Sequence, residues 1–213
     1  MVIRIPFGGG IGAVEHHSES PEAQFAHTPG LKVVSCSNPV DGYWMIQQAI
    51  ASDDPVIFLE PKRQYHADKA DLDVTATPGP LFASRVVRHG GDVTVLAYGP
   101  MVKTCLRAAE AAAGEGKSLE VIDLRSLKPL DMETVAPSVR KTGRVVGVTE
   151  AYKTGSFISE LAMRIQEEVF DWLDAPVVRI AAADVPVPMA ETLEDAAIPN
   201  VEAISAGIRQ VLR

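Results

Sequence analysis

The chain has 213 residues, of which 46% are hydrophobic and 23% are charged. This composition is typical of a globular protein and excludes an intrinsically disordered chain. The formal net charge of −8 argues against nucleic-acid binding, because phosphate backbones are bound by concentrated basic surfaces. No apolar run approaches the roughly 20 residues that cross a bilayer, and the start MVIRIPFGGG has no apolar signal core, so we expect a cytoplasmic protein.

The spacing of cysteines and histidines does not favour a transition-metal site. Cys36 and Cys105 are the two cysteines, and neither has a second cysteine at metal-ligand or redox spacing. The histidines include the adjacent pair His16 and His17 but no HExxH pattern. We expect two idle thiols and no zinc chemistry.

The first part of the chain predicts one βαβ unit behind a long irregular leader. Phe7 to Gly30 is glycine-rich and lacks sustained periodicity, which indicates a loop with one helical turn near Pro21 to Ala26. A strand at Leu31 to Val34, a helix at Tyr43 to Ala51 and a strand at Val56 to Leu59 follow. Because parallel strands usually need a larger sheet covered on both faces, we expect that an upstream part of this domain is missing or supplied by another chain.

A segment punctuated by prolines and glycines, from Pro61 to Gly91, predicts a linker. Beyond it, strand candidates alternate with helix-length segments, and right-handed crossovers would make the strands mainly parallel. The strands are predicted at Val93 to Tyr98, Leu119 to Leu124, Val145 to Thr149 and Val177 to Ile180. Apolar stripes at helical spacing predict helices at Ser156 to Phe170 and Val201 to Leu212 that pack on the sheet. The fold class is therefore α/β.

The stretch GGGIGAVEHHSESPEA is the most suggestive chemically. Its glycines permit positive φ and close backbone approach, although glycine-rich loops are common and this one lacks the dinucleotide-binding context. His16 and His17 stand among carboxylates, an arrangement that suits either proton transfer or an ordinary solvated loop. His27, before Thr-Pro-Gly, suits bracing of the next strand.

Six blocks are spread along nearly the whole chain: SPEAQFAHTPGLKVV, NP, DDPVIFLEPK, VTVLAYG, EVIDLRSLKPLD and KTGRVVGVTEA. In order and spacing they resemble the beta subunits of thiamine-diphosphate-dependent 2-oxo acid dehydrogenases. The resemblance implies three segments: the second half of a thiamine-binding pyrimidine domain at 1–65, a linker at 66–91, and a transketolase carboxyl-terminal-like domain with a mainly parallel, helix-covered sheet at 92–213.

The resemblance also implies partners and cofactors. In the family, the beta subunit pairs with an alpha subunit in an α2β2 heterotetramer, and the two share thiamine diphosphate with magnesium. The family's glutamate that contacts the aminopyrimidine lies upstream of the matched region, and no residue here corresponds to it. The carboxyl-terminal domain is the expected docking surface for the lipoyl-bearing acyltransferase core.

The family's histidine before Ser-Gln-Ser-Pro-Glu-Ala falls on His17. The resemblance implies that His17 lines the channel reached by the lipoyl arm and orients or protonates the acyl group, for which imidazole is suited near neutral pH. His16 beside it is expected to shape that channel as a cofactor-binding residue. Glu19 replaces the usual glutamine, and Cys36 and Ser37 replace the usual Pro-Arg, so these positions depart from the family pattern.

Two further groups of residues have both a functional and a structural interpretation. Ala49, Ser52 and Asp54 match the family's potassium site, yet they also suit a capped helix end. Charged residues at predicted strand ends suit either function or ion pairs that secure loops and subunit contacts, and we favour the second. These residues are Asp123, Arg125, Asp131 and Glu150.

The sequence therefore predicts the beta subunit of the decarboxylating component of a 2-oxo acid dehydrogenase complex, an enzyme only within that complex. The resemblance favours a branched-chain 2-oxo acid over pyruvate as substrate. The alternative is a truncated, noncatalytic paralogue that acts as an assembly or interaction module, which the departures at Glu19, Cys36 and Ser37 favour.

Overall fold

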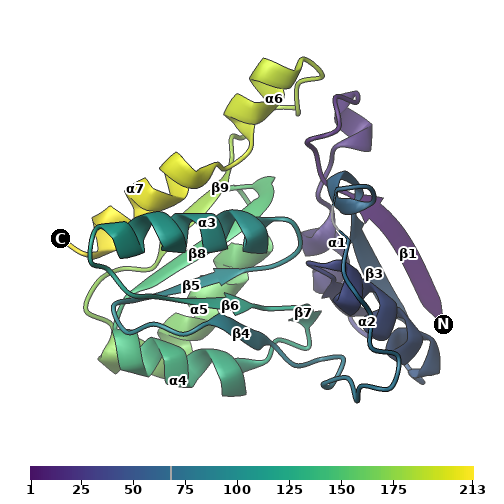
Figure 1. Ribbon diagram of the computed structural model, residues 1–213, viewed down its shortest axis with the longest axis horizontal. Coiled ribbons are helices and arrows are strands. Elements are labelled where there is room, and N and C mark those ends of the chain that lie inside the picture. Colours follow the sequence, from purple (N-terminus) through teal and green to yellow (C-terminus); the bar gives the residue numbers. More distant parts are fainter. Residues whose placement is uncertain (68) are drawn as a thin grey trace.

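The computed structural model describes residues 1–67 and 69–213, arranged around two β-sheets (Figure 1). Asp68, which falls in the predicted linker, is outside the described residues. Both sheets are mainly parallel and carry helices, so the α/β class and the parallel arrangement predicted from the sequence are confirmed.

The first sheet has the strand order β1-β3-β2-β7. Its parallel members are β1 (Val2–Phe7), β3 (Val56–Pro61) and β2 (Lys32–Ser35), while β7 (Ser126–Lys128) pairs antiparallel with β2. The prediction of a lone βαβ unit is wrong, because the unit gains β1 at one edge and β7 from far along the chain at the other. β1 is a half-exposed edge strand with a proline, so it lacks the apolar run of a buried strand.

Two helices and two short 3₁₀ turns belong to this first sheet. They are η1 (Glu15–His17), α1 (Glu22–His27), α2 (Pro39–Ala51) and η2 (Lys62–Gln64). The predicted turn before the second strand is confirmed as α1. The α2 helix begins before the predicted Tyr43, because Asn38 caps it by accepting the Asp41 N–H at 2.9 Å and Pro39 occupies its first position.

The second sheet has the order β4-β6-β5-β8-β9, with β4 antiparallel to β6 and the other neighbours parallel. Its strands are β4 (Arg85–Arg88), β5 (Val93–Ala97), β6 (Leu119–Asp123), β8 (Val145–Tyr152) and β9 (Val178–Ala182). The four strands predicted in this part are confirmed. The fifth, β4, lies within the predicted linker, where its short and partly exposed RVVR sequence gave little signal.

Helices cover both faces of the second sheet (Figure 1). One face carries α3 (Met101–Gly114) and α7 (Val201–Val211), and the other carries α4 (Met132–Thr142) and α5 (Phe157–Val169). Two shorter elements of this part of the chain are η3 (Phe170–Trp172) and α6 (Glu191–Ala197). The predicted stripes of α5 and α7 are buried, as Leu161, Ile165 and Ile204 illustrate. Among the helices of the described residues, none is long and apolar enough to cross a membrane.

One hydrophobic core joins the two sheets. Phe7 and Leu59 of the first sheet belong to the same buried cluster as Leu96, Tyr98 and Ile122 of the second. At their contact, a Cβ placed on Gly99 would lie 2.9 Å from Ser35 Oγ and 3.0 Å from Phe7 Cζ. The carboxyl ends of β1, β2 and β5 are therefore packed together without spare room.

Candidate functional site

The carboxyl ends of the parallel strands in both sheets face one another, and the loops that leave them form the candidate site. Three contacts across this junction show the arrangement: Tyr98 Oη donates to Glu22 Oε1 at 2.5 Å, Ser37 Oγ donates to Asp123, and the Gly9 N–H donates to Glu150. In open α/β sheets, ligands bind outside the carboxyl ends of the strands. Function is therefore expected in the loops that follow β1, β2 and β3.

The loop after β1 is held by two carboxylates of the second half of the chain. Gly9 N–H donates to Glu150 Oε1 at 2.5 Å, while Gly10 and Gly12 N–H donate to Glu194 Oε1 and Oε2 at 2.7 and 3.0 Å. In Figure 1 this loop meets α6, which carries Glu194. The glycine run predicted to allow close backbone approach thus approaches carboxylates within the protein.

The two predicted site histidines lie on η1, at the exposed part of the same loop. His16 and His17 are both exposed, and their ring centroids are 4.2 Å apart. The turn is shaped by the His17 N–H, which donates to Val14 O at 3.0 Å, and the loop is closed by the Gly8 N–H, which donates to Glu19 O at 2.9 Å. The imidazoles are therefore presented to the surroundings from a fixed backbone.

Behind η1, which we call the histidine turn, lies a buried acid that the sequence analysis did not single out. Glu22 is fully buried and accepts from Tyr98 Oη, with Thr149 Oγ1 3.3 Å from the same carboxylate oxygen. Burial raises the pKa of Glu22, and burial together with the Glu22 charge raises the pKa of Tyr98. Glu22 follows Ser-Pro at a helix start, where an acidic residue is usually exposed, so local sequence gave no signal of this burial.

Glu150 is the buried centre of a second acidic group. Its carboxylate accepts from Arg63 as well as from Gly9, and burial raises its pKa, with the Arg63 charge opposing that shift. Glu22 and Glu194 lie close enough to add to the increase. Arg63 and Glu194 were not predicted as site residues, because only the folded chain brings them to the glycine loop.

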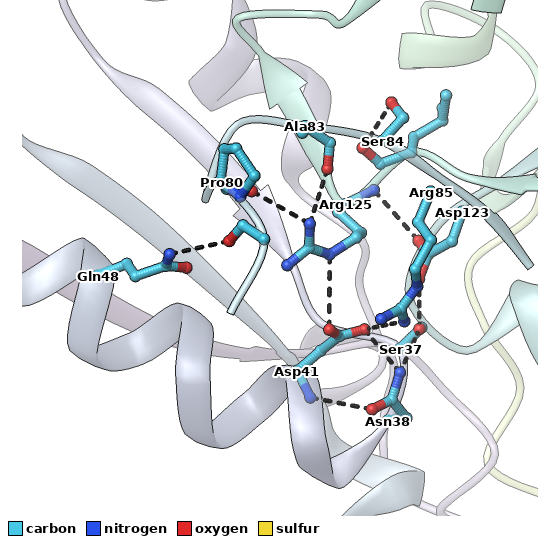
Figure 2. Close-up of polar contacts among 12 residues, drawn as sticks. Ser37, Asn38, Asp41, Gln48, Pro80, Ala83, Ser84, Arg85, Asp123 and Arg125 are labelled. Carbon is cyan, nitrogen blue, oxygen red and sulfur yellow. Dashed lines mark hydrogen bonds and ion pairs between the residues drawn. The ribbon is translucent and has the colours of Figure 1, made fainter. Parts of the chain in front are cut away.

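The loop after β2 is filled by a polar network (Figure 2). Ser37 Oγ donates to Asp123 Oδ2 at 2.5 Å, and Arg85 Nη2 donates to Asp41 Oδ2 at 2.6 Å. The Arg125 guanidinium lies 3.5 Å from Asp41 Oδ1. Burial raises the pKa of Asp123 to about 6, with the Ser37 hydrogen bond opposing and the nearby Asp41 charge reinforcing the shift.

Arg125 extends this network to the segment before β4. Its guanidinium donates to the carbonyls of Pro80 and Ala83 (Figure 2), at 3.2 and 2.8 Å. The backbone of Arg125 adopts a φ of 53°. Asp131 accepts from the Ser84 N–H and caps α4 through the Thr134 N–H. The charged residues predicted at strand ends thus secure loops within the chain, which is the interpretation that the sequence favoured.

The residues predicted to bind potassium lie at the end of α2. The Ala49 carbonyl accepts from Ser52 N–H at 3.2 Å, and Ser52 Oγ accepts from Asp54 N–H at 3.3 Å. Asp54 forms an ion pair with Lys32 at 3.5 Å. A bound cation would therefore compete with Lys32, and the potassium site stays a prediction. No group of three or more His, Cys, Asp and Glu side chains is placed to hold a metal within residues 1–67 and 69–213.

Both thiols lie in settings that disfavour reactivity. Burial raises the pKa of Cys36 to about 12, with the Glu60 and Asp41 charges reinforcing the shift. Cys36 borders a cavity of 400 Å³ that Arg4, Phe58 and Tyr65 also line. Cys105 is buried on α3, and burial raises its pKa as well. A thiol with so high a pKa remains protonated at neutral pH and is a poor nucleophile.

The architecture matches two protein families in chain order. Residues 1–67 match the pyrimidine binding domain of transketolase, and residues 83–204 match the transketolase C-terminal domain. A solved structure described as a split gene transketolase, inactive beta4 tetramer, superposes with a TM-score of 0.81 over 99% of this chain and 66% of that chain, at 24% identity. The chain therefore has the fold of transketolase-like proteins.

Three relatives with named activities are similar to this chain in sequence. The chain is 55% identical to the pyruvate dehydrogenase E1 component subunit beta of Leifsonia xyli, over 96% of this chain and 60% of that protein. It is 46% identical to the 3-methyl-2-oxobutanoate dehydrogenase subunit beta of Mycobacterium tuberculosis, over 100% and 61%, and 40% identical to the 2-oxoisovalerate dehydrogenase subunit beta of Bacillus subtilis, over 99% and 65%. The chain belongs to the transketolase C-terminal domain family, and its sequence is similar to those of 2-oxo acid dehydrogenase beta subunits. It spans less than two thirds of the length of these relatives.

Proposed function

We propose that this chain acts as the beta subunit of the decarboxylating component of a 2-oxo acid dehydrogenase complex, together with an alpha subunit in an α2β2 heterotetramer. The similarity to beta subunits of 2-oxo acid dehydrogenases and the matches to both transketolase domains support this function. The structural observation that carries it is the histidine turn, which is exposed at the carboxyl edge of the first sheet while the groups behind it are buried. The domain limits predicted from the sequence, with the linker at 66–91, are part of this proposal.

The proposed cofactor is thiamine diphosphate with magnesium, shared with the alpha subunit. When bound, this cofactor supplies the carbanion chemistry that releases carbon dioxide from a 2-oxo acid. His16 and His17 stand on an open surface, so the turn supplies one wall of a cleft rather than a closed pocket. An open wall fits a cofactor held between two chains.

The proposed role of His17 is to hold and move a proton at the end of acyl transfer to lipoamide. Its imidazole is exposed and can be reached by a long flexible arm, and imidazole exchanges protons near neutral pH. His16, whose ring contacts that of His17 at 4.2 Å between centroids, would set the orientation of its neighbour and border the cofactor. Glu19 lies at the closure of the same loop.

The substrate proposed from the sequence resemblance is a branched-chain 2-oxo acid in preference to pyruvate. Relatives named for both kinds of substrate are similar to this chain, so the assay must compare the two. The lipoyl-bearing acyltransferase core is the proposed acceptor complex. Potassium at Ala49, Ser52 and Asp54 is a further, separate part of the proposal.

The test is to purify this chain in its assembled complex with the alpha subunit and to measure thiamine diphosphate binding, 2-oxo acid decarboxylation and acyl transfer to lipoamide. We expect binding and turnover, with 3-methyl-2-oxobutanoate used more efficiently than pyruvate. A properly assembled complex without binding or turnover would reject the enzymatic function and leave an assembly module as the explanation.

A variant test addresses His17 within that complex. His17→Ala is expected to lower lipoamide-dependent acyl transfer by about 100-fold, the effect typical of losing a general acid or base. The matched control is His66→Ala, which also removes an exposed imidazole but lies after β3. Equal rates for the two variants would reject the role assigned to His17.

A further inference from the structure

The glycine loop after β1 takes its hydrogen-bond partners from residues far away in the sequence. Glu150, at the end of β8, and Glu194, on α6, together accept three backbone N–H groups of Gly9, Gly10 and Gly12 at 2.5, 2.7 and 3.0 Å. Glu194 binds two of them, one with each carboxylate oxygen. Such bidentate acceptance fixes both the position and the orientation of the loop backbone.

The two carboxylates are buried and differ in their charge partners. Glu150 is 6% exposed and forms an ion pair with Arg63, whereas Glu194 is 2% exposed. Within residues 1–67 and 69–213, no basic side chain forms an ion pair with Glu194. A buried carboxylate needs hydrogen bonds, so Glu194 depends on the glycine amides as much as the loop depends on Glu194.

The glycines themselves are required by this close approach. A Cβ on Gly8 would lie 2.7 Å from Glu150 Oε1, and one on Gly9 would lie 2.9 Å from Glu194 Oε1 and 2.8 Å from Ile198 Cδ1. At Gly12, by contrast, no atom lies within 4 Å of such a Cβ. The tightest packing of the loop is therefore against the two carboxylates and their surroundings.

The anchored backbone lies immediately beside the histidines. Gly12 precedes His16 by four residues, and the loop closes two residues after His17, where Gly8 N–H donates to Glu19 O. Ser18, which lies between His17 and Glu19, is buried. The histidine turn is thus a short bridge between two fixed points, and a shift of Gly10 or Gly12 would move its imidazoles.

We propose that Glu150 and Glu194 are positioning residues that hold the imidazole of His17 in place by binding the amides of the glycine loop. Neither carboxylate touches the reacting groups in this proposal. It rests on the proposed function only for what His17 does, because the geometry of the anchor is independent of turnover. Through Glu194, the placement of α6 would set the placement of the histidine turn.

Glu194→Gln tests the anchor, because it keeps the shape of the side chain while replacing one acceptor oxygen with an NH₂ donor that faces an N–H group. The matched control is Glu191→Gln, the same change at an exposed position of the same helix. We expect hydrogen exchange at the Gly10 and Gly12 amides to become about tenfold faster in Glu194→Gln and to stay unchanged in the control. The NMR signals of the His17 ring should shift only in Glu194→Gln.

In the assembled complex, Glu194→Gln should lower the kcat of acyl transfer with little change in the KM for the 2-oxo acid. Unchanged exchange and unchanged His17 ring signals would overturn the proposal, and so would a normal kcat in a variant whose loop exchanges faster. If the unaltered complex shows no turnover, the proposed function fails. The exchange and ring signals then still decide whether the carboxylates position the turn.

Discussion

The loops that follow β1 and β2 leave the same edge of the first sheet, yet one is exposed and the other is filled. After β2, Ser37 and Asp41 meet Asp123 and Arg125 in a buried network that also binds the segment before β4 (Figure 2). After β1, the backbone is bound from behind, while the rings of the histidine turn face outward. A strand-end position thus indicates where function is expected, but burial decides which of these loops is available to a ligand.

The largest effect is expected at Arg125, which holds the filled loop together. Arg125→Ala leaves the carbonyls of Pro80 and Ala83 and the carboxylate of Asp41 without the guanidinium, and it should lower the free energy of unfolding by about 3–5 kcal/mol. Urea unfolding measures this change. The control Arg164→Ala removes an exposed ion pair with Glu168 and should change it by about 0.5 kcal/mol or less. Similar losses in both variants would contradict a special role for the network.

The next effect concerns how the stability of the folded chain depends on pH through Asp123, which belongs to the same polar network. Because the pKa of Asp123 is raised to about 6 in the folded chain, the folded state binds this proton more tightly than the unfolded state. The contribution of Asp123 to stability is therefore full below its unfolded pKa of about 4 and is lost as the pH rises through about 6.

Asp123→Asn should remove this dependence, since asparagine does not titrate and its carbonyl can accept from Ser37. Between about pH 4 and pH 7, the stability of the original chain relative to Asp123→Asn should fall by about 3 kcal/mol or less. Unfolding curves across this range measure the difference. Parallel pH profiles for the two proteins would show that Asp123 titrates as it does in the unfolded chain.

Whether a feature of the structure could be predicted from the sequence depends on how far apart in the chain the interacting residues lie. Apolar spacing predicted β5, β6 and β8, because each is buried between two layers of helices. It also predicted β9, an edge strand that is partly buried. The edge strands β1, β4 and β7 were missed, since β1 and β4 are partly exposed and β7 is too short to show a periodicity.

The residue types of the histidine turn, and the family pattern around them, pointed to His16 and His17 as site residues. Their structural support could not be predicted in the same way. Glu194 lies 184 residues from Gly10, and Arg63 lies 87 residues from Glu150, so local sequence shows neither contact. Both contacts exist only because the two sheets pack with their carboxyl ends together. The sequence therefore singles out the two exposed histidines, whose role stays a prediction, but not the buried framework that holds their turn.

A matched pair of glycines measures how differently the junction between the two sheets and the loop after β1 are packed. Gly99, at the junction of the sheets, and Gly12, in the histidine loop, both have positive φ, at 53° and 62°, so alanine strains the backbone at either position. The added Cβ meets Ser35 and Phe7 at Gly99 but meets nothing within 4 Å at Gly12. We expect Gly99→Ala to lower the unfolding free energy by about 1–2 kcal/mol more than Gly12→Ala does. Equal losses would show that the junction relaxes freely.

The smallest effect on stability is expected at His17, although its effect on activity is expected to be large. Its side chain is exposed and its ring centroid lies 4.2 Å from that of His16, so His17→Ala should change the unfolding free energy by about 0.5 kcal/mol or less. Thermal unfolding of the variant beside the unaltered chain measures this difference. A loss above about 1 kcal/mol would mean that the imidazole supports the loop, and any fall in acyl transfer would then have a structural cause. A stable but inactive variant would instead separate the two loops cleanly, with stability assigned to the filled one and chemistry to the exposed one.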